Sequence, residues 1–144
     1  MFTDTHAHLN DTAFDSDRGE VIARAGSVDV SSIVEIACAP AEWLPAVQLA
    51  SAFPGLIRCA FGIHPVCVTD FTLAAMAELE TILFQPCAVA VGEMGLDYWW
   101  EPDRKEAQLA LLETQLELCV RRHKPAVFHV PRPQWQGPSP ERLL

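Results

Sequence analysis

The chain has 144 residues and a net charge of −9, and half of its residues are hydrophobic, which fits one folded domain and excludes a disordered chain. Its acidic balance offers no extended basic face of the kind that grips a nucleic-acid backbone. A phosphate-bearing substrate would therefore need bound metal cations to supply much of the local positive charge.

Strands and helices are predicted to alternate along the chain. Apolar runs rich in β-branched residues indicate strands, whereas apolar residues at three- and four-residue spacing indicate helices. In chain order the pattern predicts a strand at 2–5, a helix at 17–25, a strand at 32–38, a helix at 41–52, a strand at 56–62, a helix at 72–83, a strand at 88–92, a helix at 103–123 and a strand at 126–129.

This alternation is typical of a parallel α/β sheet. The unbroken apolar run at 88–92 fits a strand that is buried on both faces. Along the helix at 103–123, we expect an apolar stripe of Leu109, Leu112, Leu116 and Cys119. Right-handed crossovers would bring the carboxyl ends of all strands to one edge of the sheet.

The five cysteines are scattered, without a CxxC pair, which argues against a disulfide framework and against a thiolate zinc site. We interpret them as small buried hydrophobic residues. No apolar run reaches the roughly 18–20 residues of a membrane span, and the N-terminus lacks the pattern of a secretory signal. The sequence therefore predicts a cytoplasmic protein that does not enter a membrane.

Two histidines, His6 and His8, stand one residue apart where the first strand ends. Residues two apart in a strand point to the same face, so the two imidazoles can converge on one point. Neutral imidazole is a common metal ligand, although such a pair alone is a weak signal.

Other strands end in similar chemistry. His64 follows the third strand, Glu93 follows the fourth and His129 closes the fifth. A carboxylate directly after a buried apolar run is costly unless it is paired or ligates a metal. Each residue alone has a simple structural explanation, but together, at one edge of a parallel sheet, they indicate an active site. Imidazole and carboxylate ligands suit zinc, manganese, iron or nickel better than magnesium, and two ions bridged by Glu93 would support metal-assisted hydrolysis.

Several further polar and aromatic residues receive no firm role from the pattern. Asp97 is interpreted as a turn residue, His123 as a helix-end or surface residue, and the role of Asp4 stays open. Trp99 and Trp100 fit either a substrate edge or aromatic packing over the mouth of a barrel.

Four segments, in order, resemble the TatD family of metal-dependent deoxyribonucleases, which are amidohydrolase-like TIM barrels. They are TDTHAHL at 3–9, GIHP at 62–65, VGEMGLDY at 91–98 and KPAVFH at 124–129. The resemblance implies an α/β fold that is a partial TIM (β/α) barrel, with about five parallel strands and intervening helices. Residues 1–130 would be the N-terminal portion of the barrel, and 131–144 a proline-rich divergent tail.

The resemblance also implies roles for individual residues. His6 and His8 would bind one divalent cation, His129 would bind a second, and Glu93 would bridge both and act in catalysis. His64 would contact the substrate. The two cations would be zinc, manganese, nickel or magnesium. The reaction would be hydrolysis of DNA phosphodiester bonds by metal-activated water, on single-stranded DNA or at DNA ends.

Family members are roughly twice as long, about what an eight-stranded barrel needs. A histidine from a later strand and an aspartate of a TDxP-like segment have no counterpart here, so we expect a C-terminally truncated chain with impaired catalysis. Two alternatives stay open: a related metal hydrolase of small phosphate or amide substrates, and a non-catalytic barrel fragment that acts through protein association. The sequence indicates no particular protein partner.

Overall fold

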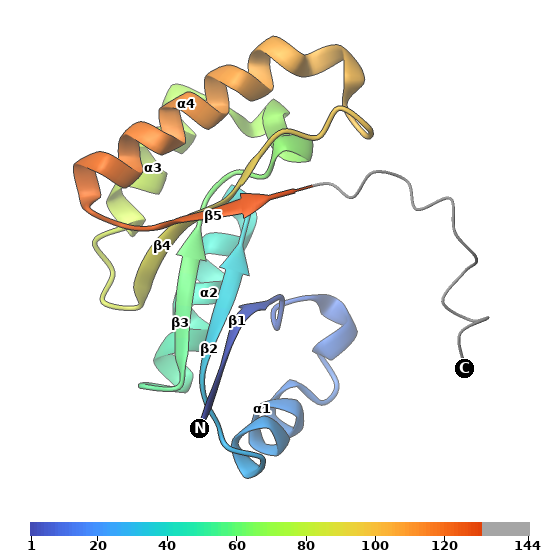
Figure 1. The fold of residues 1–144 in the computed structure, drawn as a ribbon. Coiled ribbons are helices and arrows are strands. Elements are labelled where there is room, and N and C mark those ends of the chain that lie inside the picture. Colours follow the sequence, from blue (N-terminus) through green and yellow to red (C-terminus); the bar gives the residue numbers. More distant parts are fainter. Residues whose placement is uncertain (131–144) are drawn as a thin grey trace, which may run out of the picture.

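A curled sheet of five parallel strands organises the computed structural model, which describes residues 1–130 (Figure 1). The strands pair in the order in which they occur along the chain, as successive strands of a TIM barrel do. The predicted α/β fold with five parallel strands is therefore confirmed, and the predicted tail at 131–144 lies outside the described residues. The strands are β1 (Phe2–Ala7), β2 (Val30–Ala37), β3 (Ile57–Phe61), β4 (Ala88–Gly95) and β5 (Ala126–His129).

Helices follow the first four strands, as predicted. They are α1 (Arg18–Ser27), α2 (Pro40–Ala52), α3 (Leu73–Ile82) and α4 (Lys105–Arg122), with short 3₁₀ segments at η1 (Thr12–Phe14), η2 (Pro65–Asp70) and η3 (Pro102–Arg104). Local residues explain several boundaries. Pro40 opens α2, where a missing N–H costs nothing, and the Thr72 hydroxyl accepts a hydrogen bond from the backbone N–H of Ala75 at the start of α3. Within residues 1–130, we find no helix both long enough and apolar enough to cross a membrane.

Strand β4 is longer than the sequence predicts, because it continues through the residues that pair with β5. Met94 lies opposite Phe128, and Gly95 lies opposite His129. Glu93 therefore lies inside the strand rather than in the loop that follows it.

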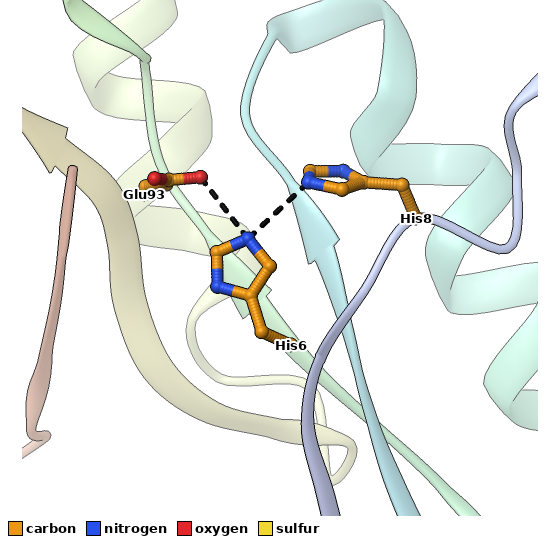
Figure 2. Close-up of side chains that lie close together, drawn as sticks. All are labelled: His6, His8 and Glu93. Atoms are coloured by element: carbon orange, nitrogen blue, oxygen red, sulfur yellow. Dashed lines mark hydrogen bonds and ion pairs between the residues drawn. The ribbon is translucent and has the colours of Figure 1, made fainter. Parts of the chain in front are cut away.

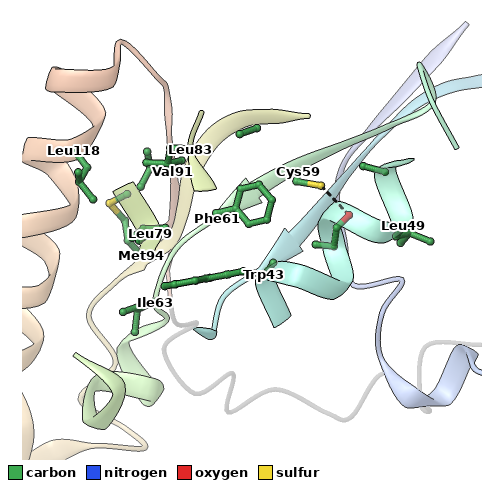
Figure 3. Close-up of a cluster of buried hydrophobic side chains, with 14 of the residues drawn as sticks. Trp43, Leu49, Cys59, Phe61, Ile63, Leu79, Leu83, Val91, Met94 and Leu118 are labelled. Atoms are coloured by element: carbon green, nitrogen blue, oxygen red, sulfur yellow. Dashed lines mark hydrogen bonds between the residues drawn. The ribbon is translucent and has the colours of Figure 1, made fainter. Parts of the chain in front are cut away.

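The main core lies between the helices and one face of the sheet. Trp43 of α2, Phe61 of β3 and Met94 of β4 are all fully buried there (Figure 3). The indole Nε1 of Trp43 also donates a hydrogen bond to the carbonyl oxygen of Gly62 at 3.0 Å, so this large side chain is buried with its polar atom satisfied. On the opposite face of the sheet, the described residues form a small cluster around Ile36, Ala60 and Ala90.

The buried face of α4 differs from the predicted apolar stripe. Leu109 is 42% exposed, whereas Gln108 and Gln115 are fully buried beside Leu111 and Leu118. Hydropathy alone assigns glutamine to the surface, and this is why the predicted stripe was misplaced toward Leu109.

Both buried glutamines bind the backbone of a segment that follows a strand. Gln115 accepts a hydrogen bond from the N–H of Ile63 at 2.8 Å and donates one to its carbonyl oxygen at 3.0 Å. Gln108 does the same for Asp97, at 2.7 and 3.0 Å. Helix α4 therefore fixes the segments after β3 and β4, which carry His64 and Asp97.

Replacing Gln115 by leucine should destabilise the fold, because it leaves the buried N–H and C=O of Ile63 without partners. We expect the free energy of unfolding to fall by about 2–6 kcal/mol, from two unsatisfied groups. Chemical denaturation followed by circular dichroism measures this. Gln48→Leu, at an exposed position of α2, is the control and should change little. Equal stability of the two variants would contradict a stabilising role for the hydrogen bonds between Gln115 and Ile63.

Candidate metal centre

The carboxyl ends of β1, β4 and β5 bring together four of the side chains that the sequence singled out. Nε2 of His6 lies 3.3 Å from Oε2 of Glu93 and 3.3 Å from Nε2 of His8 (Figure 2). On the other side of the same carboxylate, Nδ1 of His129 lies 3.2 Å from Oε1. Glu93 therefore stands between two groups of imidazoles.

The possible ligand atoms form two groups that share one carboxylate. His6, His8 and Glu93 make the first group, and His64, Glu93 and His129 make the second. Within each group the atoms lie within 4.8 Å of one another. The structure thus brings all five singled-out residues into one place, while their roles as metal or substrate ligands stay predictions.

Burial differs across this centre. Glu93 is only 9% exposed and forms its buried base, whereas His6 and His8 are exposed and His129 is half-buried. A ligand can therefore reach the imidazoles from solvent, while the carboxylate stays shielded.

The segment after His8 is held by a buried carboxylate that the sequence analysis did not single out. Glu35 of β2 is 1% exposed and accepts hydrogen bonds from the N–H of Leu9 at 2.6 Å and of Asn10 at 3.0 Å. Burial raises the pKa of Glu35, although both N–H donors favour its ionised form. An acidic residue inside an otherwise apolar strand was the available signal, since such a residue requires buried partners.

Asp97 also has a larger role than the turn that the sequence indicates. One carboxylate oxygen, Oδ1, accepts hydrogen bonds from the N–H of Trp99 and of Trp100, both at 3.0 Å, which is the expected turn. The other, Oδ2, lies 3.1 Å from Nε2 of His129. The carboxylate thus orients the ring so that Nδ1 faces Glu93, as carboxylates do behind histidines that bind metals.

The charge state of Asp97 fits this role. Asp97 is 2% exposed, and burial alone would raise its pKa. The N–H of Trp100, the His129 ring and the N–H of Trp99 outweigh burial and hold the pKa of Asp97 below its ordinary value. The carboxylate is therefore ionised at neutral pH and can accept a hydrogen bond from His129 when Nε2 of that ring carries the proton.

His64 differs from the other histidines in how its ring is held. Its Nδ1 accepts a hydrogen bond from the N–H of Val66 at 3.2 Å, so in the neutral ring the proton lies on Nε2. The ring packs edge-on against His129, with 4.2 Å between the centroids. Burial, together with the nearby His129 ring, lowers the pKa of His64. His64 therefore offers a neutral N–H donor at the edge of the centre.

The cysteines do not join this centre. All five thiols are free, and burial raises the pKa of Cys38, next to Glu42, to about 12. Burial also raises the pKa of Cys59, Cys67 and Cys119. The thiols whose pKa is raised stay protonated at neutral pH, and neither group of possible ligand atoms includes a cysteine.

The remaining donor set fits divalent cations. Imidazole nitrogen and carboxylate oxygen are ligands that zinc and neighbouring transition metals accept. Among the described residues, the first group offers three ligand atoms, and the second offers Glu93 and His129 with the N–H of His64 beside them. A catalytic metal keeps positions open for water or substrate.

Two glycines beside Glu93 allow β5 to approach β4 closely. Gly92 and Gly95 have φ values of +137° and +156°, a backbone conformation that residues other than glycine rarely adopt. A Cβ on Gly92 would lie 2.4 Å from the carbonyl oxygen of Val127, and one on Gly95 would lie 2.6 Å from that of His129. The short distance between Glu93 and His129 therefore depends on having glycine at both positions.

Comparison with known proteins identifies the family of this chain. A family profile described as TatD related DNase matches residues 3–136. The chain belongs to this family. It is 34% identical over 129 residues to the uncharacterised metal-dependent hydrolase YabD of Bacillus subtilis, covering 90% of this chain and 50% of the relative. It is 31% identical over 126 residues to the 3'-5' ssDNA/RNA exonuclease TatD of Edwardsiella piscicida, covering 88% and 48%.

The fold agrees with solved structures of the family. The crystal structure of YJJV, a TatD homologue from Escherichia coli K12, superposes with a TM-score of 0.83 at 29% identity. That match covers 91% of this chain and 51% of the other. The predicted partial barrel is confirmed, and the chain spans about half the length of the relatives it matches.

Replacing Gly95 by alanine should distort the centre, because the new methyl group would meet the backbone of His129. We expect the free energy of unfolding to fall by about 1–3 kcal/mol, the usual cost of a strained φ, and the imidazole NMR signals of His129 to shift. Gly26→Ala, at a helical site with no neighbour within 4 Å, is the control and should be neutral or stabilising. Unchanged His129 signals in Gly95→Ala would contradict the close approach.

Replacing Asp97 by asparagine should weaken metal binding without removing a proposed ligand, because His129 would lose its ionised partner. We expect the affinity for Zn²⁺ or Mn²⁺ to fall by roughly 10- to 100-fold, as for other partners behind metal-binding histidines. Titration calorimetry measures the change. Asp103→Asn, at an exposed position of η3, should bind as the wild type does, and an equal affinity in both variants would argue against the orienting role.

Proposed function

We propose that the chain carries part of the active site of a metal-dependent hydrolase, a TatD-like deoxyribonuclease that cleaves phosphodiester bonds with metal-activated water. The observation that carries the proposal is the sharing of the Glu93 carboxylate between two imidazole groups, at 3.3 Å from His6 and 3.2 Å from His129. A carboxylate shared in this way can bridge a pair of adjacent cations of the kind that two-metal hydrolases use.

Two divalent cations would be held by these residues. His6, His8 and Glu93 would hold one, and Glu93 and His129 would hold the other. Zinc, manganese and nickel suit the ligands best, with magnesium as a further candidate. When bound, such ions lower the pKa of water and polarise a phosphoryl oxygen.

The chain's own residues would orient the reactants around these ions. Glu93, buried and reached from both sides, would fix the separation of the two cation positions. Asp97 would hold the His129 ring in the required orientation through its 3.1 Å contact. His64, with its proton on Nε2, would donate a hydrogen bond to a non-bridging oxygen of the scissile phosphate.

Single-stranded DNA or DNA ends are the proposed substrates, and the cytoplasm is the proposed location. The relative from Edwardsiella piscicida bears the name of a nuclease that acts on single-stranded DNA and RNA. The net charge of −9 fits a substrate that is held by cations rather than by a basic surface. Because the described residues offer few ligands to each cation, we expect weak metal binding and slow turnover.

A second candidate is a non-catalytic fragment that acts through protein association. The outer edges of β1 and β5 are unpaired within residues 1–130, and unpaired edges favour association. Light scattering together with metal stoichiometry distinguishes the candidates, because this one needs no bound cation. A panel of DNA ends, small phosphate esters and amides would distinguish a nuclease from a related hydrolase.

Replacing Glu93 by glutamine should remove the second cation and most of the activity, because the amide would replace the shared carboxylate. We expect Mn²⁺ stoichiometry to fall from two per chain to at most one, and release of nucleotides from labelled single-stranded DNA to fall at least tenfold. Glu113→Gln, at an exposed position of α4, serves as the control. Turnover in Glu93→Gln at the wild-type rate would show that the nuclease proposal is wrong.

A further inference from the structure

We propose that Trp99 and Trp100 form a stacking platform for unpaired bases of a nucleic-acid strand whose phosphate lies at the metal centre. This inference rests on the proposed function and extends it from the phosphate to the bases. It assigns a function to an aromatic pair that neither the core nor the metal centre uses.

The two tryptophans are unusual in their exposure. Trp99 is 63% exposed and Trp100 is 72% exposed, whereas Trp43 is fully buried in the core. Consecutive tryptophans with their rings in solvent represent apolar surface that the described part of the fold leaves without a partner. The adjacent Tyr98 is itself partly exposed and has the ammonium of Lys105 over its ring, 5.0 Å from the centroid.

A single buried carboxylate joins the aromatic pair to the metal centre. Oδ1 of Asp97 accepts hydrogen bonds from the backbone N–H groups of both tryptophans at 3.0 Å, while Oδ2 lies 3.1 Å from Nε2 of His129. Gln108 fixes the backbone of Asp97 from α4. Trp99 and Trp100 follow Asp97 by two and three residues, which span at most about 7 and 11 Å, so the backbone of the platform stays close to the Asp97–His129 contact.

The hydrogen bonds to Asp97 fix the backbone of Trp99 and Trp100 and leave their rings exposed. Both tryptophan side chains are exposed although their N–H groups are bonded, so the segment has a defined position and an open surface. This combination suits a platform that receives a planar ligand, because the ligand need not order the backbone on binding.

Charge favours bases over a second phosphate contact as the occupant. The chain has a net charge of −9, Arg104 near the platform is paired with Glu101 at 3.5 Å, and Lys105 holds its ammonium over the Tyr98 ring. Contacts that do not depend on cations therefore suit a strand beyond the metal-held phosphate better than further phosphate contacts do. Stacking of a base on an aromatic ring is such a contact, and removing one ring typically weakens binding roughly fivefold to a hundredfold.

The geometry also indicates single strands rather than duplexes. A base offers its flat face to an aromatic ring only when it is unstacked from its neighbours, as at a single-stranded end. A small alkyl phosphate ester has no ring to stack, so the platform would favour a nucleic-acid end over such a substrate.

The test compares two labelled phosphorothioate strands of equal length and charge, one with normal thymine bases and one abasic at its terminal positions. Binding to the full chain in Mn²⁺ is read by fluorescence anisotropy. We expect the abasic strand to bind at least fivefold more weakly. Trp99→Ala/Trp100→Ala should lose this difference, and Trp99→Phe/Trp100→Phe should restore it in part, because phenylalanine retains a ring.

Phe84→Ala is the matched control. Phe84 is an exposed aromatic residue with the Arg122 guanidinium over its ring, 4.3 Å from the centroid. It lies between α3 and the start of β4, whereas the metal centre lies at the carboxyl ends of the strands. This variant should keep the preference for bases.

The outcomes separate the two proposals. Equal binding of both strands by the wild type would overturn the platform and leave the proposed function standing, since the phosphate contact would carry the affinity. Binding of neither strand would overturn both proposals. A preference for bases that persists in the double alanine variant would assign stacking to other residues and overturn the platform.

Discussion

The site depends on one constraint, the burial of the Glu93 carboxylate between imidazoles from two distant parts of the chain. A buried carboxylate is costly unless charged or polar partners surround it. Here His129 comes from β5, which pairs directly with β4, whereas His6 comes from β1, three strands away, and the curl of the sheet in Figure 1 brings it to Glu93. Gly92 and Gly95 complete the arrangement, because they allow β5 to approach the strand that bears the carboxylate.

Much of the architecture could be predicted because it follows from local patterns. Alternating apolar runs and helical periodicity indicated the five strands and four helices, and their boundaries mostly shifted by a few residues. The buried face of α4 could not be predicted in the same way. Gln108 and Gln115 are polar, and their partners Asp97 and Ile63 are 11 and 52 residues away in the sequence. Only the tertiary structure shows that these amides replace apolar side chains in the core.

The centre shows the same division. Residues at the ends of strands could be proposed from their chemistry and order, because parallel strands share one edge. What surrounds them depends on contacts that no local pattern encodes. Glu35 supports the segment after His8 from another strand, and Asp97 contacts His129 across 32 residues while it also closes a turn. Sequence reasoning therefore indicated the residues at the centre and missed the carboxylates that hold them.

The two glutamines of α4 have a consequence for how this part of the chain can vary. They lie seven positions apart, about two helical turns, so both face the sheet and each meets a different strand end. Inserting or deleting one residue between them would rotate one amide by about 100° around the helix axis. Length variation among homologues should therefore be scarce between positions 108 and 115 and more common in the connections that the helix does not touch.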